Sequence, residues 1–214
     1  KRRERELKRR NERLDEFTSI ISHDLRNPLH VAEARAEMAR ADCDSEHLAD
    51  VIDAVDRCQT LVDDTLTLAR QGEQIGERDP VGLSDVAEQS WQTVMTESAE
   101  LRTEPGLTIR ADRSSLRQLL ENLCRNAVEH GGSDVIVRIG EMDGGFFVAD
   151  TGPGIPEPDR GDVFEAGYST ADDGTGFGLR IVKEITDAHG WEISVTESWQ
   201  GGARFEITDV EKHV

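Results

Sequence analysis

Apolar residues recur about every seven positions through the first 71 residues, the period of helices that pack along a shared seam. The pattern predicts one long helix over residues 1–40, a polar loop over Arg40–His47 and a second helix after it. The first seam contains Leu7, Leu14, Ile21 and Pro28, and the second contains Leu48, Val51, Val55, Cys58, Val62, Thr65 and Ala69. An antiparallel hairpin of two such helices leaves its seam half covered. We therefore expect a homodimer in which two hairpins form a four-helix bundle.

Beyond residue 71 the chain mixes helical and strand periods. A linker is expected at 72–80, which contains Gly72, Gly76 and Pro80. Helices are then predicted over Ser84–Glu97, Ser114–His130 and Phe177–His189, and strands over Glu100–Thr103, Leu107–Ala111, 135–139, Phe146–Asp150, 193–195 and 203–207. This mixture predicts a mixed sheet with helices on one side. We expect two domains: an all-α hairpin with a coiled-coil entry at 1–71, and an α/β domain at 81–214.

Charge is distributed unevenly over the 214 residues, which carry a formal net charge of −19. Residues 1–13 hold eight basic and three acidic side chains, so the remainder is strongly acidic. The acidic body argues against nucleic acid as a partner. It also suggests adaptation to a salt-rich cytoplasm, where screening shortens electrostatic repulsion.

The sequence also indicates the cellular compartment of the protein. No uninterrupted apolar stretch approaches the roughly 18 residues of a membrane helix, so no transmembrane segment is expected. Three cysteines without metal-ligand spacing suit a reducing, cytoplasmic compartment. Because the chain begins at Lys1 within a charged helical pattern, we interpret it as a fragment of a longer protein.

The predicted first helix carries an exposed histidine beside a carboxylate. His23 lies two residues after seam residue Ile21, and at about 100° per residue it faces away from the seam. A neutral imidazole is a nucleophile, and Asp24 can accept from its other ring nitrogen and fix the tautomer. Pro28 predicts a kink just beyond. A lone exposed histidine is usually surface decoration, the interpretation given to His30, His47 and His213.

Two asparagines share one face of the helix predicted at Ser114–His130. Asn122 and Asn126 are four residues apart, the spacing of side-chain neighbours on a helix. An amide oxygen is a hard, neutral ligand that can hold magnesium without competing with nucleotide phosphates. Taken alone, the pair is more often simply two surface asparagines.

Two glycine-rich segments follow. Asp150–Ile155 (DTGPGI) comes directly after a predicted strand, where a carboxylate can accept from the exocyclic amine of adenine, and Gly152 and Gly154 permit close backbone approach. Gly174–Leu179 (GTGFGL) opens a predicted helix, and glycine amides at a helix N-terminus bind phosphates. It is not a dinucleotide-binding fingerprint, because no strand precedes it. Each string alone also describes an ordinary turn.

Between these segments lie two aromatic residues, Phe164 and Tyr168, four apart in a polar stretch. They can anchor a lid over a bound nucleotide. The equally weighted alternative is that they tether a surface loop.

The motifs together resemble the two-domain core of sensor histidine kinases of two-component signalling, over about Asp15–Thr208. HDLRNPL resembles the phosphoacceptor box, NLCRNAVEH the asparagine box, DTGPGI and GTGFGL the two glycine boxes, and FEAGY the phenylalanine box. The acidic composition and the string NAVEHGG resemble members from halophilic archaea. The resemblance implies a dimerising hairpin, an α/β sandwich shared with gyrase-type ATPases, and an upstream sensor domain missing from this fragment.

The resemblance also implies a protein-histidine kinase. His23 would be phosphorylated from ATP and pass its phosphoryl group to an aspartate of a response regulator receiver domain. Asp24 would orient His23 or act as a base, and Asn27 would position water during dephosphorylation of the partner. Asn126 would hold magnesium and Asp150 would select adenine. The nucleotide-binding residues implied are Asn122, Asn126, His130, Asp150, Gly152, Gly154, Ile155, Phe164, Tyr168, Gly174, Thr175, Gly176, Gly178 and Leu179.

Three features depart from the family pattern. Glu129 stands where the family usually carries Lys, Arg160 is the one basic residue between Ile155 and Leu179, and Ala203 replaces a Thr near the adenine. Phosphate charge would then be met by magnesium, by the helix at Phe177 and by His130, Arg125 or Arg180. The alternative to an active kinase is a weak ATP-binding phosphatase or scaffold that regulates a response regulator through Asn27.

Overall fold

The computed structural model describes residues 25, 28–40, 45, 47–48, 50–52, 54–55, 58–59, 61–62, 76–94, 98–132, 134–165 and 176–213. The chain divides into two compact units, Lys1–Glu73 and Gln74–Val214. No described helix combines the length and the hydrophobicity of a membrane-spanning segment. The domain bounds expected from the sequence, 1–71 and 81–214, remain predictions.

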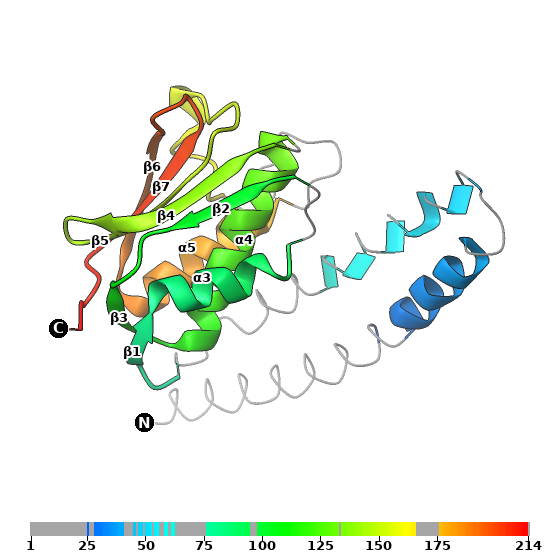
Figure 1. Ribbon diagram of the computed structural model, residues 1–214, viewed down its shortest axis with the longest axis horizontal. Helices are drawn as coiled ribbons and strands as arrows, with labels where there is room; N and C mark the ends of the chain where they lie inside the picture. Colours follow the sequence, from blue (N-terminus) through cyan, green and yellow to red (C-terminus); the bar gives the residue numbers. More distant parts are fainter. Residues whose placement is uncertain are drawn as a thin grey trace, which may run out of the picture. The chain divides into compact units, whose positions relative to one another are not determined.

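The described part of the first unit is a helical hairpin (Figure 1). Residues 28–40 are helical, and so are the described residues between 47 and 62. Gln59 Nε2 donates a hydrogen bond to Glu33 Oε2 across the pair (2.9 Å), and Ala36 is buried. The two predicted helices are therefore present over these ranges.

Hydrophobic side chains remain exposed on this hairpin. The predicted seam of the second helix divides into half-buried Leu48, Val55 and Val62 and exposed Val51 and Cys58. Within the described residues, the large hydrophobic side chains of the hairpin that are 41–61% exposed are Leu25, Val31, Met38, Val51 and Leu61. A single hairpin thus leaves apolar surface uncovered, and Val51 is the member of the predicted seams among these side chains.

The second unit is built on a sheet that is five-stranded in the described residues. Its strands are β2 (Glu100–Thr103), β4 (Ile136–Met142), β5 (Gly145–Ala149), β7 (Ala203–Thr208) and β6 (Glu192–Glu197), in that spatial order. β2 runs parallel to β4, and the other neighbours are antiparallel. A mixed sheet is therefore confirmed.

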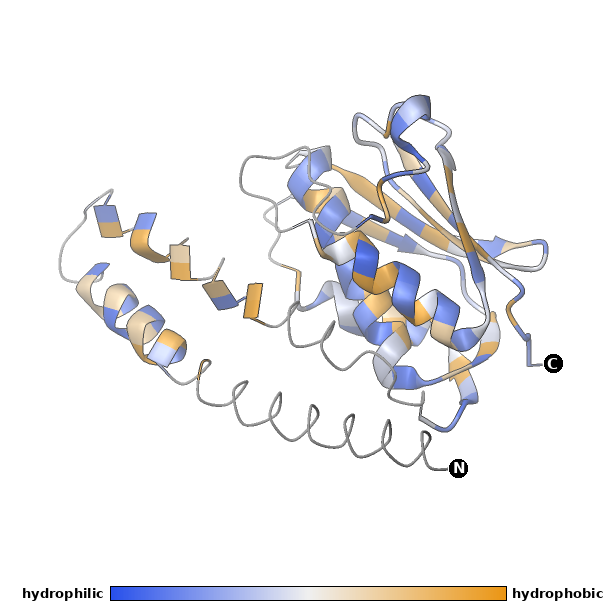
Figure 2. Ribbon diagram, turned by 180° about the vertical axis from the view of Figure 1, so that it is seen from behind, coloured by the Kyte–Doolittle hydropathy of each residue, from blue (hydrophilic) through white to orange (hydrophobic). Residues whose placement is uncertain are grey.

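Helices cover one face of this sheet (Figure 1). They are α3 (Leu83–Trp91), α4 (Arg113–Gly131) and α5 (Gly178–His189), with α4 packed between α3 and α5. Figure 2 shows hydrophobic and hydrophilic residues alternating around α4 and α5. The inward face of α4 buries Leu116, Leu119, Leu120, Leu123 and Ala127, spaced by three and four residues. This is the one-sided helix layer that the sequence predicts.

The ends of the two long helices have clear local causes. Asp112 caps α4, because its side chain accepts from the backbone N–H of Ser115 (2.7 Å). α5 ends at Gly190, whose φ of 73° is the left-handed conformation that glycine adopts most readily. The predicted bounds of both helices were therefore accurate to within one residue.

Two predictions about the start of this unit were wrong. Asp79–Gly82 forms a strand, β1, which pairs antiparallel with β3 (Thr108–Ala111), although Asp79 and Pro80 were assigned to the linker. Proline is tolerated there because β1 is an edge strand. The helix predicted to reach Glu97 ends at Trp91, where the Thr93 hydroxyl donates to Ser90 O (2.7 Å) and a turn begins.

Candidate functional site

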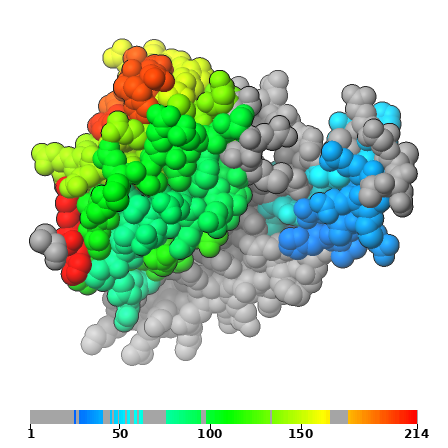
Figure 3. Space-filling model, in the orientation of Figure 1, coloured from blue at the N-terminus to red at the C-terminus, as the bar shows by residue number. Residues whose placement is uncertain are grey.

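Four segments far apart in sequence meet at one end of the sheet and its helices. They are the loop after β5, the C-terminal half of α4, the start of α5 and the turn between β6 and β7. The loop after β5 and the β6–β7 turn lie side by side (Figures 1 and 3), and a Cβ placed on Gly154 would overlap the carbonyl oxygen of Gly201. Most predicted nucleotide-binding residues in the described part of the chain belong to these segments.

Asp150 is held by backbone groups at the end of β5. Its side chain is buried, and its Oδ1 accepts from Gly152 N (2.8 Å) and Ala203 N (3.1 Å). Among the described residues, both of these N–H groups bond Oδ1, which leaves Oδ2 to accept from a ligand. Burial raises the pKa of Asp150, while the two N–H bonds and attraction by His130 oppose that rise.

The Asp150 main chain is tied to the β6–β7 turn. Asp150 N donates to Ala203 O (2.9 Å), and the hydroxyl of Ser198, itself buried, donates to Asp150 O (2.5 Å). Ser198 N donates to Gly202 O (2.8 Å) and closes the turn. The carboxylate is therefore positioned by both β5 and the neighbouring hairpin.

Glycines permit the close approaches around Asp150. A Cβ on Gly202 would overlap the carbonyl oxygen of Asp150, and a Cβ on Gly152 would lie 2.7 Å from Gly131 Cα. Gly154 has a φ of 74°, a conformation that side chains disfavour. Gly152 thus permits a close contact with the end of α4, and Gly154 permits one with the β6–β7 turn.

The start of α5 lies against the two asparagines of α4. A Cβ on Gly178 would be 3.2 Å from Asn122 Oδ1 and 3.4 Å from Asn126 Oδ1. The N-cap residue Phe177 forms no side-chain cap, and Gly176 before it has a φ of 69°. A helix N-terminus without such a cap carries partial positive charge and attracts phosphate.

The two asparagines differ in their surroundings. Asn122 is 3% exposed; its Nδ2 donates to Gln118 O (2.9 Å) and its Oδ1 accepts from Arg125 Nη2 (2.5 Å). An oxygen that already accepts from a guanidinium is a poor magnesium ligand, whereas Asn126 is half-buried beside Gly178. Asn126 therefore fits a magnesium ion. Asn122, whose amide is bonded at both ends, fits a structural role on the same face of α4.

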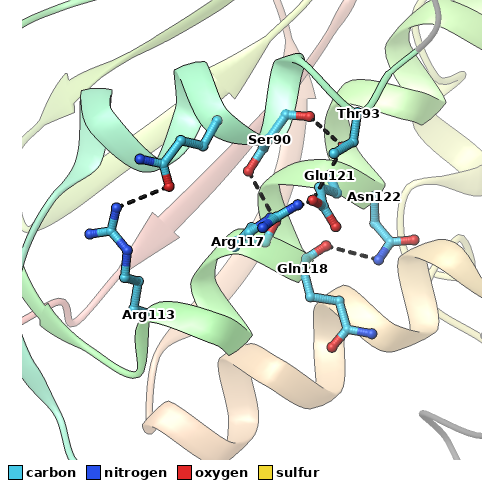
Figure 4. A network of polar contacts seen from close by, with 8 residues as sticks. Ser90, Thr93, Arg113, Arg117, Gln118, Glu121 and Asn122 are labelled. Atoms are coloured by element: carbon cyan, nitrogen blue, oxygen red, sulfur yellow. Dashed lines mark hydrogen bonds and ion pairs between the residues drawn. The ribbon is translucent and has the colours of Figure 1, made fainter.

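A polar network fixes α4 against α3 (Figure 4). The Ser90 hydroxyl donates to Arg117 O (3.2 Å), and Glu121 Oε1 accepts from Arg117 Nε (2.7 Å) and from the Thr93 hydroxyl (3.2 Å). The same figure shows Asn122 bonded to Gln118 O one turn along. This network fastens the helix that carries the asparagines.

The loop after Asp150 is partly ordered by its own contacts. Arg160 Nε donates to Ile155 O (2.9 Å), and Val163 is 2% exposed, with half-buried Phe164 beside it. The Nε–H group of Arg160 is therefore bonded to the backbone of its own loop. Leu179 is half-buried in the first turn of α5.

Several predicted residues lie outside the described residues: His23, Asp24, Asn27, Tyr168, Gly174 and Thr175. Their roles remain predictions. Among the described residues, His130 is exposed near Asp150, and no cluster of three His, Cys, Asp or Glu side chains can hold a metal. A magnesium ion at Asn126 would therefore take further oxygens from the nucleotide and from water. His30, His47 and His213 are exposed, as predicted.

Ser198, Gly202 and Gly131 help to shape the site but were not predicted from the sequence. Each acts on a segment distant in the chain, so no local spacing marks it. The one usable signal was the Gly201–Gly202 pair between the last two predicted strands.

Comparison with known families matches both halves of the chain. Residues 13–74 match the His Kinase A (phospho-acceptor) domain, and residues 111–212 match the histidine kinase-, DNA gyrase B- and HSP90-like ATPase family. His23 and Asn27 fall within the first range, and Asn126 and Asp150 within the second.

Relatives match nearly the whole chain. The chain is 29% identical over 92% of its length to the signal transduction histidine-protein kinase/phosphatase MprB of Mycobacterium tuberculosis, covering 44% of that protein. It is 31% identical over 90% of its length to the sensor histidine kinase ZraS of Klebsiella oxytoca, covering 45%. The chain thus spans about half the length of the curated relatives it matches. These relatives are bacterial and give no support to the expected similarity to halophilic archaeal members.

Solved structures of histidine kinases are also similar to this chain. Full-length ShkA in complex with AMPPNP is 28% identical, with a TM-score of 0.64 over 93% of this chain and 46% of that one. The mycobacterial sensor histidine kinase MprB is 25% identical, with a TM-score of 0.52 over 63% of this chain and 97% of that one.

Proposed function

The chain belongs to the sensor histidine kinases of two-component signalling, and from this we propose that it phosphorylates its own His23 with ATP and transfers the phosphoryl group to an aspartate of a response regulator. The observation that carries the proposal is the meeting of Asp150, its glycines and the start of α5 with Asn126, in a chain that also matches the phospho-acceptor domain.

The proposed reaction is an in-line displacement at the γ-phosphate. A ring nitrogen of His23 forms a bond to phosphorus, the bond to the bridging oxygen breaks, and ADP leaves. Asp24 would accept a hydrogen bond from the other ring nitrogen and stabilise the positive charge that develops on the ring. Because the reaction depends on placement and charge neutralisation, the fixed carboxylate of Asp150 and the first turn of α5 are the groups that hold the nucleotide.

Each nucleotide group has a candidate partner. Asp150 Oδ2 would accept from the exocyclic amine of adenine, and the start of α5, at Gly176 and Gly178, would receive the phosphates. Asn126 would hold a magnesium ion, which supplies positive charge against the phosphates when bound. Gly174, Thr175 and Tyr168 would complete the lid.

We also propose an oligomeric state, a cellular environment and a further domain for the protein. The exposed hydrophobic side chains of the hairpin, such as Val31 and Val51, support a homodimer that buries them in a four-helix bundle. The net charge of −19 supports function in a salt-rich cytoplasm. An upstream sensor domain would complete the protein, since the chain spans about half the length of its relatives.

Phosphatase activity is the second candidate. The relative MprB is named a kinase/phosphatase, and Asn27 lies four residues after His23, close enough on a helix to position water near a phosphoryl group. In that alternative the chain binds ATP weakly and acts chiefly by removing phosphate from its response regulator.

Incubation with γ-labelled ATP and magnesium, at low and high KCl, tests the proposal. We expect acid-labile label on the wild-type chain and none on His23→Gln. His30→Gln is the matched control, because His30 is an exposed histidine seven residues further along the chain and should leave labelling unchanged.

The two candidates predict different results. Equal labelling of His23→Gln and wild type would exclude His23 as the acceptor. An unlabelled wild-type chain that still binds ATP, at either salt concentration, would favour the phosphatase or scaffold.

A further inference from the structure

The hydrogen bonding between β5 and β7 changes where β5 ends. The two strands pair antiparallel up to Ala149 and Arg204, so the next residues to face each other are Asp150 and Ala203. Asp150 N donates to Ala203 O (2.9 Å), which is one of the two bonds that such a pair exchanges. The N–H of Ala203 donates instead to the Asp150 side chain, at Oδ1 (3.1 Å). One bond of the ladder is therefore replaced by a bond that holds the carboxylate.

Ser198 supplies the donor that this exchange removes from the Asp150 carbonyl. In a regular ladder Asp150 O would accept from Ala203 N; here it accepts from the Ser198 hydroxyl (2.5 Å). Buried backbone carbonyls are almost always paired, so without the hydroxyl this oxygen would draw the Ala203 N–H back into the ladder. The hydroxyl thus allows the Ala203 N–H to remain on the carboxylate.

The β6–β7 turn fixes the position of Ser198. Ser198 is 6% exposed, its N–H donates to Gly202 O (2.8 Å), and its carbonyl oxygen accepts from Gly201 N (3.1 Å). Gly202 leaves room for the approach, because a Cβ there would overlap Asp150 O, the atom that the hydroxyl reaches. The backbone of the turn therefore directs the hydroxyl at one atom of the nucleotide site.

On this basis, and resting on the proposed function, we propose that Ser198 is a positioning residue for recognition of the base. It acts through Asp150: its bond to Asp150 O leaves the Ala203 N–H to fix Oδ1, and the fixed carboxylate presents Oδ2 to the exocyclic amine of adenine. The substrate class that this arrangement favours is a purine nucleotide with an amine at position 6. A carbonyl at that position would place two acceptors against each other.

Ser198→Ala tests this role, because it removes the hydroxyl and little else. Without that donor the Ala203 N–H should return to Asp150 O and release the carboxylate. Affinity for ATP should then fall about tenfold, the scale of one hydrogen bond to a charged group. Inosine triphosphate has a carbonyl in place of the amine, so its affinity should stay unchanged and the preference for ATP should fall by the same factor.

Three further variants separate the hydrogen bond from the packing of the turn. Ser198→Thr keeps the hydroxyl and should keep the preference for ATP, whereas Ser198→Cys fills a similar volume with a weak donor and should lose most of it. Thr196→Ala is the matched control, because the Thr196 hydroxyl also donates to a backbone carbonyl of this hairpin, Arg204 O (3.5 Å). This variant should bind both nucleotides as wild type does.

Titration calorimetry of wild type and the four variants, with the magnesium complexes of ATP and of inosine triphosphate, provides the measurement. Chemical denaturation shows which variants are folded. A wild-type preference for ATP in Ser198→Ala, or in Ser198→Cys if Ser198→Ala does not fold, would overturn the role of Ser198. Equal losses of affinity for both nucleotides would overturn it too, because they indicate damage to the whole site. A wild-type chain that binds neither nucleotide would overturn the proposed function as well.

Discussion

The two long helices of the α/β unit begin in different ways. α4 starts at Asp112, whose Oδ1 accepts from Ser115 N and from the Ser114 hydroxyl (2.6 Å), and whose own N–H donates to His189 Nε2 (3.2 Å). α5 starts after Gly176 and Phe177, and its N-cap residue offers no side-chain cap. α4 therefore begins with a side chain that caps it by hydrogen bonds, and α5 begins without a side-chain cap.

The difference separates a structural helix start from a ligand-binding one. An N-terminus capped by a carboxylate has its N–H groups and its dipole partly neutralised, which stabilises the helix but disfavours an anion. Without a carboxylate cap, the start of α5 is suited to phosphate.

The same contrast extends to the surroundings of each end. At the capped start, His189 is 3% exposed, stacks on Trp191 (4.2 Å between ring centroids) and has both ring nitrogens paired with backbone groups. The start of α5 lies instead beside glycines and the side chains of Asn122 and Asn126. Substitutions at the first end should therefore change stability, and substitutions at the second should change nucleotide binding.

The largest expected effect is at the nucleotide end. A Cβ on Gly202 would overlap the Asp150 carbonyl oxygen and crowd its carboxylate (2.5 Å to Oδ1), so Gly202→Ala must displace Asp150. We expect loss of measurable ATP binding and a fall of about 2–3 kcal/mol in the free energy of unfolding. Calorimetric titration and chemical denaturation measure the two effects.

Gly161→Ala is the control for this substitution. A Cβ there meets nothing within 4 Å, so ATP binding should be retained. Normal ATP affinity in Gly202→Ala would mean that Asp150 does not depend on the β6–β7 turn.

The next effect is at the capped end, at His189. Its Nδ1 bonds Ile185 O (2.8 Å) and its Nε2 accepts from Asp112 N, so it must be neutral. His189→Phe keeps the stack on Trp191 but leaves these backbone groups unpaired. We expect a loss of about 1–3 kcal/mol in the free energy of unfolding, measured by denaturation, with ATP affinity unchanged.

His189 also predicts a pH dependence. Burial lowers the pKa of His189, and Arg78 lowers it further, while the bond to Ile185 O and attraction by Asp112 partly oppose that shift. The unfolded chain takes up a proton near pH 6.5 while the folded chain does not, so stability falls as the pH drops from about 8 to 6. His189→Phe should flatten this decline, and exposed His213→Gln should keep it; equal slopes in all three proteins would exclude His189 as the cause.

Sequence alone predicted the parts of this comparison that are local. The bounds of α4 and α5 were predicted to within one residue at each end, and Asp150 was singled out for its place after a strand. β1 was missed because Pro80 and Gly76 are typical of a linker, and its pairing with β3 is a tertiary contact. Ser198 and Gly202 act on Asp150 from about 50 residues away, so neither could be read from spacing.

The smallest effect tests the cap itself. Asp112→Ala removes the side-chain bond to Ser115 N but keeps the backbone bond to His189, and it should cost about 1 kcal/mol of stability. Asp112→Asn keeps an oxygen acceptor and should recover most of that loss, since Asn caps about as well as Asp. ATP affinity should be the same in both variants and in wild type. A change in ATP affinity without a change in stability would mean that the capped end contributes to the nucleotide site, and that the division between the two helix starts is wrong.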